Sequence, residues 1–216
     1  EDVAKTGIPR IRFMTSHPWD FDDRMIDVIS KYDNIMPYIH LPLQSGSDRI
    51  LKLMGRRYTK EKYIELYNKL KKKIPGCSIT TDIIVGFPGE TREDFEETLD
   101  VVNKCQYDSA FTFIFSPREG TPAAKMVDDI PLEEKNKRLY ELNDLVNKFA
   151  NEHNQVYMNK TVPVLIEGHG EKGNLFGYTD TMKLVNVDGS DDNIGKIVDV
   201  KITDVKTWSM DGKIVE

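Results

Sequence analysis

The segment SITTDIIVGFPGET, residues 78–91, determines the fold that we expect for the first half of the chain. It joins an almost continuous apolar run to a Phe-Pro-Gly turn, and Thr91 then begins a helical pattern that extends to about residue 104. An apolar run rich in Ile and Val is typical of a strand in a parallel sheet that is buried on both faces. The segment therefore predicts a strand, a turn and a helix, which is part of a βαβ unit.

The same alternation continues on both sides of this segment. Further strands are predicted at 8–15, 36–43 and 109–116, and helices at 48–54, at 59–73 and from an N-cap at Asp20 onward. Strands separated by helices predict an α/β domain with a parallel sheet or barrel. Because only these strands are expected and the chain starts almost inside one of them, the pattern indicates the C-terminal part of a larger domain. A long charged helix over 132–158 follows.

The pattern changes at Asn159. Short strands are predicted at 161–167, 175–179, 182–187, 197–205 and 213–215, separated by turns that contain Gly and Asp. Short strands in such close succession predict a small closed β-barrel of the OB-like type. We therefore expect one domain over residues 1–158 and a second over residues 159–216.

Composition excludes several classes of protein. The 216 residues contain 30 Lys and Arg against 36 Asp and Glu, a net charge of -6 that argues against a globally basic nucleic-acid binder. No apolar run approaches the roughly 20 residues that a membrane span needs, and residues 1–10 do not form a signal peptide. Cys77 and Cys105 cannot build a disulfide framework, so a cytoplasmic location is expected. Both cysteines are predicted to be small buried hydrophobic residues, and the histidines lack the spacing of a metal site.

Loops at the carboxyl ends of parallel strands are the usual place for a ligand. Here these loops are 16–18, 44–48, 86–90 and 116–118, all polar and rich in Gly, Pro or Ser. The 86–90 loop either brings bare backbone at Gly86 close to a flat ligand, or is simply a Pro88-Gly89 turn followed by an acidic first helical turn. The 44–48 loop either binds ribose or phosphate, or caps the next helix through Ser47 or Asp48. Asp82 lies inside an apolar strand and so needs a partner or a function.

Two groups of side chains are candidates for binding RNA. Residues 52–73 carry nine Lys and Arg against two Glu, which indicates either a phosphate-binding face or an ordinary solvated helix face. In the small barrel, Lys and aromatic side chains suited to phosphate contact and base stacking are Lys183, Lys196, Lys201, Lys206, Phe176, Tyr178 and Trp208.

Three long motifs, in this order, resemble one enzyme family. They are HLPLQSGSDRILKLMGRRYT (40–59), TTDIIVGFPGET (80–91) and FTFIFSPREGTPAAKM (111–126), and they resemble the radical SAM methylthiotransferases, most of all the MiaB-type branch that modifies tRNA. Residues 159–216 resemble the C-terminal TRAM domain of that family, a small RNA-binding barrel. The resemblance implies the C-terminal portion of a partial (β/α)6 barrel followed by a TRAM domain.

The resemblance also implies an activity and its cofactors. Such enzymes use S-adenosylmethionine and two [4Fe-4S] clusters to add a methylthio group at C2 of N6-isopentenyladenosine next to the anticodon. The implied partners are the tRNA anticodon stem-loop and a reductant such as a flavodoxin or ferredoxin. The CxxxCxxC motif and the further cluster cysteines of the family are absent here, so we expect a fragment that begins at the third barrel strand. We predict no catalytic residue and no metal ligand in this chain, and no activity for it alone.

Positions matching the family motifs give candidate S-adenosylmethionine contacts. By resemblance, Ile84 and Gly86 lie near adenine, and Gln44, Ser45 and Asp82 lie near the methionine or ribose. The remaining candidates are Phe115 and Ser116, whose backbone would meet adenine, and Arg118, which would face a carboxylate of cofactor or substrate.

Other functions stay open at this point. Members of the same family act on N6-threonylcarbamoyladenosine in tRNA or on an aspartate of a ribosomal protein. A non-catalytic RNA-binding module is an alternative from another class. An unrelated α/β-barrel enzyme would need its own set of acid/base residues or metal ligands, and the sequence shows no such set.

Overall fold

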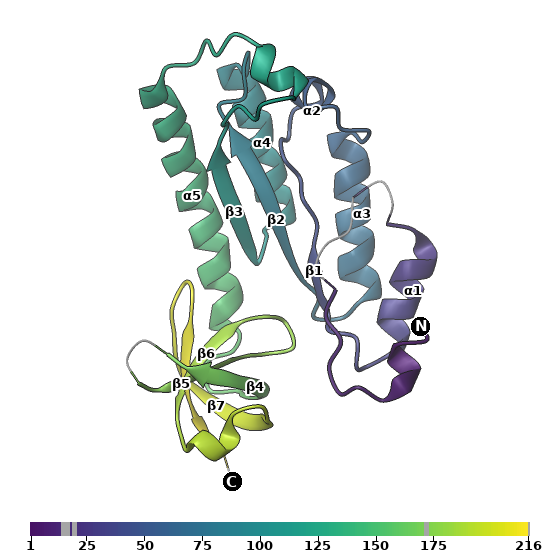
Figure 1. Cartoon of the computed structure of the whole chain (residues 1–216), viewed down its shortest axis with the longest axis vertical. Coiled ribbons are helices and arrows are strands. Elements are labelled where there is room, and N and C mark those ends of the chain that lie inside the picture. The colour runs from purple at the N-terminus through teal and green to yellow at the C-terminus, as the bar shows by residue number, and fades with distance from the viewer. Residues whose placement is uncertain (14–17, 19–20, 171–172, 216) are drawn as a thin grey trace.

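The computed structural model describes residues 1–13, 18, 21–170 and 173–215. An α/β part comes first, and a small β-barrel follows at the far end of a long helix, α5 (Figure 1). The first part contains η1 (Ala4–Thr6), α1 (Asp23–Lys31), β1 (Tyr38–His40), α2 (Asp48–Leu53), α3 (Lys60–Lys73), β2 (Ser78–Val85), α4 (Arg92–Cys105), β3 (Ser109–Ile114), η2 (Pro122–Lys125) and α5 (Leu132–Gln155). The barrel contains β4 (Thr161–His169), β5 (Leu175–Tyr178), β6 (Leu184–Asp188), η3 (Asp191–Asn193), β7 (Ile197–Val205) and β8 (Met210–Ile214).

The predicted parallel sheet is confirmed, with β2 between β1 and β3. One face packs on α3, α4 and α5 in a single core that includes Tyr63, Phe95 and Val146. The other face is open along the carboxyl half of β2, where Asp82 and Ile84 are half-buried while Ile83 and Val85 are buried. The expectation that this strand is buried on both faces was therefore wrong for its second half.

The start of the chain differs from the prediction. In place of a strand over 8–15, the described residues show only an isolated parallel bridge between Ile11 and Ile35. Part of the predicted strand and the predicted N-cap Asp20 lie outside the described residues. Helix α1 is capped by Asp22, whose carboxylate accepts a hydrogen bond of 2.8 Å from the amide of Met25.

The predicted small barrel is confirmed as a closed one, in the order β4-β5-β6-β8-β7. Neighbouring strands are antiparallel except for β6 and β8, which are parallel. Its interior is filled by aliphatic side chains, among them Val164, Ile166 and Ile202. Strand β8 pairs with β6 on one side and β7 on the other, so it is the strand that closes the barrel.

The last turn of α5 attaches the barrel to the sheet. The side-chain amide of Asn154 donates to the carbonyls of Lys206 and Thr207, both at 3.0 Å. Asp108, just before β3, lies 3.3 Å from the ammonium of Lys183 and 3.2 Å from Nδ1 of His153. Because these groups come from the sheet, the helix and the barrel, the two parts are joined by polar contacts. None of the described helices combines the length and apolar character required to cross a membrane.

Candidate functional site

Backbone hydrogen bonds bring the loops at the carboxyl edge of the sheet together. The amide of Gln44 donates to the carbonyl of Asp82 at 2.8 Å, and the amide of Ile84 donates to the carbonyl of Gln44 at 2.9 Å. Gln44 has a φ of 69°, a left-handed conformation that turns the chain at this point. On the other side of β2, the amide of Phe115 donates to the carbonyl of Val85 at 2.9 Å. The structure therefore places Gln44, Ile84 and Phe115 along one edge.

Asp82 has the partner that its position in an apolar strand required. Its carboxylate lies 3.3 Å from Nε2 of His40, and its side chain keeps 30% of its surface exposed. Nδ1 of His40 lies 3.0 Å from the hydroxyl of Thr80, and the imidazole packs edge-on against Phe111 with the ring centroids 6.0 Å apart. This arrangement leaves a carboxylate that is held in place and still accessible on the open face.

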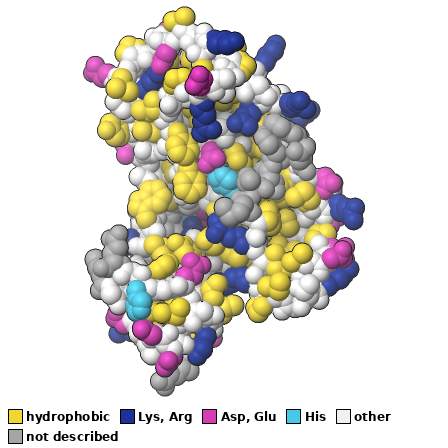
Figure 2. All heavy atoms as spheres, viewed as in Figure 1, with side chains coloured by type: hydrophobic (Ala, Val, Ile, Leu, Met, Phe, Trp, Pro, Cys, Tyr) yellow, Lys and Arg dark blue, Asp and Glu magenta, His cyan; other side chains and the backbone are white. Residues whose placement is uncertain are grey.

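Exposed aromatic rings lie beside this carboxylate. Phe111 is in register with Asp82 and Phe113 with Ile84, and the two phenylalanine residues are 54% and 52% exposed. Figure 2 shows hydrophobic side chains gathered on this face of the sheet, next to an acidic and a histidine side chain. A contiguous apolar surface of this kind marks a binding face. Sequence reasoning did not select Phe111 or Phe113, although the aromatic alternation in FTFIF was the available signal.

The Gly86 turn is fixed by a buried ion pair. The amide of Gly86 donates to Glu90 at 2.9 Å, and Arg138 of α5 donates to the same carboxylate at 2.8 Å. The side chains of Glu90 and Arg138 are only 1% and 6% exposed. Burial raises the pKa of Glu90, and the hydrogen bonds from Arg138 and from the Gly86 amide offset part of this effect.

The space beside Gly86 is filled by this chain itself. A Cβ atom on Gly86 would lie 2.5 Å from Cγ of Lys135, whose ammonium pairs with Asp128 at 2.6 Å. The φ of 69° also favours glycine. The turn needs glycine so that the stem of Lys135 can cross it, and a ligand contact with Gly86 stays a prediction.

The 44–48 loop turns its hydroxyl groups inward. Ser45 is fully buried, and its hydroxyl accepts a hydrogen bond of 3.2 Å from the amide of Ser47. Ser47 caps α2 by accepting from the amide of Ile50, and donates to Asp94 at 2.6 Å. Of the two interpretations of this loop, capping is the role that the structure shows for Ser47. Ser45 supports the loop from inside, and its predicted cofactor contact is not tested by these bonds.

Gly46 lies against the backbone of α4, so substituting it is expected to destabilise the α/β part. A Cβ atom there would lie 2.5 Å from the carbonyl oxygen of Glu97 and 2.5 Å from Cα of Thr98. Because backbone atoms must move, Gly46→Ala should lower the free energy of unfolding by about 1–3 kcal/mol in urea denaturation. Gly168→Ala is the control, since its Cβ would make only an ordinary contact of 3.7 Å. Equal stability of the two variants would contradict this account.

The last predicted cofactor contacts lie beyond β3. Phe115 is half-buried and packs edge-on against Phe87, with ring centroids 5.0 Å apart. Ser116 and Arg118 are exposed, and within the described residues the guanidinium of Arg118 has no ion-pair partner. Arg118 is therefore accessible to an anion.

The RNA-binding candidates of the barrel divide into three sets. Phe176, Tyr178 and Lys206 line one groove of about 790 Å³, where the two rings meet edge-on with centroids 6.1 Å apart. Lys196, Lys201 and Trp208 are exposed, the last by 58%. Lys183 is instead buried, and burial lowers its pKa while Asp108 opposes this effect. Lys183 thus joins the two parts of the chain and does not present its charge on the surface.

Ion pairs engage much of the basic run at 52–73. Lys60 pairs with Glu97 at 2.7 Å, Lys71 with Asp108 at 3.2 Å, and Lys69 with Asp23. The charge available to a phosphate is therefore smaller than the sequence indicated, which favours the interpretation as a solvated helix face.

The two cysteines are buried and free. Burial raises the pKa of Cys77 to about 12 and that of Cys105 to about 11. They agree with the prediction of small buried hydrophobic residues. No group of three or more His, Cys, Asp or Glu side chains in the described part of the chain is arranged to hold a metal ion.

Comparisons with known proteins identify both parts of the chain. The radical SAM superfamily matches residues 2–102, and the TRAM domain matches residues 155–215. The tRNA-2-methylthio-N(6)-dimethylallyladenosine synthase of Anoxybacillus flavithermus is 54% identical over 218 residues, covering 100% of this chain and 41% of that protein. The enzyme of the same name from Staphylococcus epidermidis is 51% identical, with 100% of this chain and 42% of that protein covered.

A solved structure supports the fold. Coproporphyrinogen III oxidase of Escherichia coli, a radical SAM enzyme, has a TM-score of 0.54 at 13% identity, covering 88% of this chain and 45% of that chain. At this identity the likeness shows the fold alone. The chain spans about two fifths of the length of the curated relatives it matches. From its two domain matches and its identity over the whole length, the chain belongs to the radical SAM methylthiotransferase family, as a radical SAM segment joined to a TRAM domain.

Proposed function

We propose that this chain is the part of a tRNA methylthiotransferase that completes the S-adenosylmethionine site and holds the RNA. The enzyme would add a methylthio group at C2 of N6-isopentenyladenosine next to the anticodon. The observation that carries the proposal is identity of 51–54% over the whole chain to synthases named for that modification. It favours this substrate over N6-threonylcarbamoyladenosine or a ribosomal aspartate. We place the boundary between the two domains at residues 158 and 159.

The open sheet face fits S-adenosylmethionine chemically. Asp82 offers an accessible carboxylate for ribose hydroxyls, and His40 holds it in position. Ile84 and the exposed ring of Phe113 offer an apolar surface for the adenine plane. The backbone of Gln44 lies at the same edge, although the residue is buried, and Arg118 is accessible to a carboxylate.

The residues of this chain would bind and orient, and the bound groups would supply the radical and sulfur-transfer chemistry. Asp82 would fix the ribose, while Ile84 and Phe113 would exclude water beside the base. Glu90 and Arg138 would keep the Gly86 turn rigid. Cys77 and Cys105 do not fit an iron-sulfur cluster, because both thiols are buried and their pKa values are raised. Two [4Fe-4S] clusters would need ligands from elsewhere in the enzyme, and a flavodoxin or ferredoxin would supply the electron.

Substitutions of Gln44 and Asp82 in the complete enzyme test this assignment. Gln44→Ala and Asp82→Ala should each weaken S-adenosylmethionine binding by about tenfold, the loss of one hydrogen bond to a charged or strongly polar group. Isothermal titration calorimetry measures the affinity, and Asp100→Ala on the outer surface of α4 is the control. Unchanged affinity in both variants would remove the two residues from the site.

A further inference from the structure

A second pocket lies at the opposite end of the sheet, where the strands begin and the barrel packs on them. Its volume is about 470 Å³, within the about 300–1,000 Å³ typical of small-ligand sites. We call it the junction pocket; its walls include Tyr38, Thr80 and Phe111 from the sheet and Thr181, Lys183 and Trp208 from the barrel. Figure 2 shows the surface hollowed between the two parts. Most residues proposed for S-adenosylmethionine lie toward the carboxyl ends of the strands, and Phe111, in register with Asp82, lies between the two sites.

We propose that the junction pocket receives one unstacked nucleotide of the RNA substrate. The base would stack on aromatic rings of both domains, and Arg12 would contact the adjacent phosphate. This inference rests on the proposed function, since it specifies how the RNA is held.

Aromatic side chains are exposed around this pocket. Trp208 is 58% exposed and Phe111 is 54% exposed, although both line it. Tyr178 and the buried Tyr38 also line the pocket, and the guanidinium of Arg12 lies 5.3 Å from the ring centroid of Tyr38. Unpaired bases bind to proteins mainly by stacking on such rings, because every base has a π-face.

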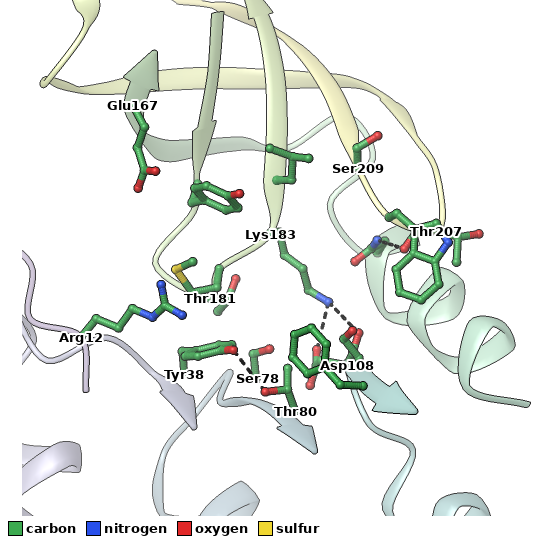
Figure 3. A pocket seen from close by; sticks show the side chains of 17 residues that line it. Arg12, Tyr38, Ser78, Thr80, Asp108, Glu167, Thr181, Lys183, Thr207 and Ser209 are labelled. Carbon is green, nitrogen blue, oxygen red and sulfur yellow. Dashed lines mark hydrogen bonds and ion pairs between the residues drawn. The ribbon is translucent and has the colours of Figure 1, made fainter. Parts of the chain in front are cut away.

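The interior is polar without carrying a free charge. Lys183 points toward Asp108 in Figure 3, and their 3.3 Å contact compensates the charges at the back of the pocket. Hydroxyl groups of Ser78, Thr80 and Thr181 also line it. The hydroxyls of Thr80 and Thr181 already bond to His40 at 3.0 Å and to Tyr157 at 2.8 Å, so they offer a base or a ribose 2′-hydroxyl only the hydrogen bonds that these partners leave.

Positive charge is found at the rim. Arg12 points toward the pocket beside Tyr38 and Thr181 in Figure 3, and it makes no ion pair within the part of the chain that the structure describes. Glu167 also lines the pocket and is acidic, so a phosphate contact falls to Arg12.

The junction pocket adjoins the groove on the barrel, with which it shares wall residues. Tyr178, Leu184 and Ser209 line both, and the groove adds Phe176 and Lys206. A strand of RNA lying along the groove would therefore reach the junction pocket with its next nucleotide. Because the two cavities adjoin, the junction pocket is placed to take a nucleotide of a strand that occupies the groove.

RNA binding by this chain tests the inference. The probe is a fluorescently labelled anticodon stem-loop RNA, and fluorescence anisotropy gives its affinity at several salt concentrations. Trp208→Ala should weaken binding by about tenfold, the loss of one base stack. Arg12→Ala should weaken it and reduce the slope of log K against log salt by about 0.7, the loss of one phosphate contact. Tyr140→Ala and Arg24→Ala, exposed residues outside the pocket, are the matched controls and should leave both quantities unchanged.

The outcomes separate the inference from the proposed function. If Phe176→Ala weakens binding while the Trp208 and Arg12 variants bind like the wild type, the chain binds RNA in the groove alone and the inference is overturned. Adenosine monophosphate could quench tryptophan fluorescence, and Trp208→Ala could abolish the quenching without changing the RNA affinity. The pocket would then take a free nucleotide, a result that also overturns the inference. If the unaltered chain binds no RNA at all, the proposed RNA-holding role fails as well. Circular dichroism of each variant confirms that it is folded.

Discussion

Asp108→Ala is expected to lower the free energy of unfolding by about 3–5 kcal/mol, because it leaves a buried cation without a counterion. The carboxylate lies 3.3 Å from the ammonium of Lys183, whose side chain is 10% exposed. It also accepts hydrogen bonds from His153 at 3.2 Å and from the amide of Ile79 at 3.0 Å. Urea denaturation followed by circular dichroism and by tryptophan fluorescence measures the loss.

The control for Asp108 is Asp100, which pairs with Lys104 on the surface of α4 and is 52% exposed. Asp100→Ala should cost less than about 1 kcal/mol. Asp108→Ala with Lys183→Met removes both charges and should recover part of the loss. If Asp108→Ala were no more destabilising than Asp100→Ala, Asp108 would not hold the barrel on the sheet.

Acid should reproduce the effect of removing Asp108. Burial raises the pKa of this carboxyl, but the hydrogen bond from His153 and the charges of Lys183 and Lys71 outweigh it and hold the pKa well below its ordinary value. A carboxyl with a depressed pKa in the folded state contributes stability above its unfolded pKa of about 4 and loses it as the pH falls further. The difference in stability between wild type and Asp108→Ala should therefore shrink below about pH 4.

Arg138→Met is expected to destabilise the α/β part by about 3–5 kcal/mol, because Glu90 would remain as an unpaired buried charge. Glu90 accepts from Arg138 at 2.8 Å and from the amide of Gly86 at 2.9 Å, so the same change should loosen the Gly86 turn. Urea denaturation gives the stability. Glu90→Gln combined with Arg138→Met should be less destabilised than Arg138→Met alone.

Arg92 offers a closely matched control for Arg138. Both guanidinium groups lie over the ring of Phe95, at 5.2 Å for Arg92 and 5.9 Å for Arg138. Arg92 is 40% exposed and pairs with surface carboxylates of Glu96 and Glu141, so Arg92→Met should cost about 1 kcal/mol or less. Equal losses for the two variants would mean that packing on Phe95, and not the buried charge, accounts for the effect.

Local sequence signals predicted most of the elements, because each depends on residues close together in the chain. Helix α4 begins directly after Thr91, as predicted, and Ser47 caps α2. The structure adds that Thr91 caps α4 and that Asp94 completes a capping box. The strand predicted at 197–205 appears with the same bounds as β7. The strand predicted over residues 8–15 was wrong, because an apolar run does not reveal whether a neighbouring strand will pair with it.

Contacts between distant residues account for the parts of the site that were missed. Lys135 crosses Gly86 from a helix that follows it by many residues, so a glycine that looked open to a ligand is covered. Lys183 looked like a surface cation, but its position beside Asp108 depends on how the barrel docks. The exposure of Phe111 depends on which face of β3 the helices cover.

The position of β8 has a consequence for synthesis on the ribosome. Until residues 210–214 have been made, β4, β5, β6 and β7 can form only an open sheet whose outer strands are β6 and β7. Both strands then present unpaired backbone groups to other nascent chains. A chain that lacks β8 is therefore expected to pair with other chains through these two edges, and the barrel loses this hazard once β8 closes it.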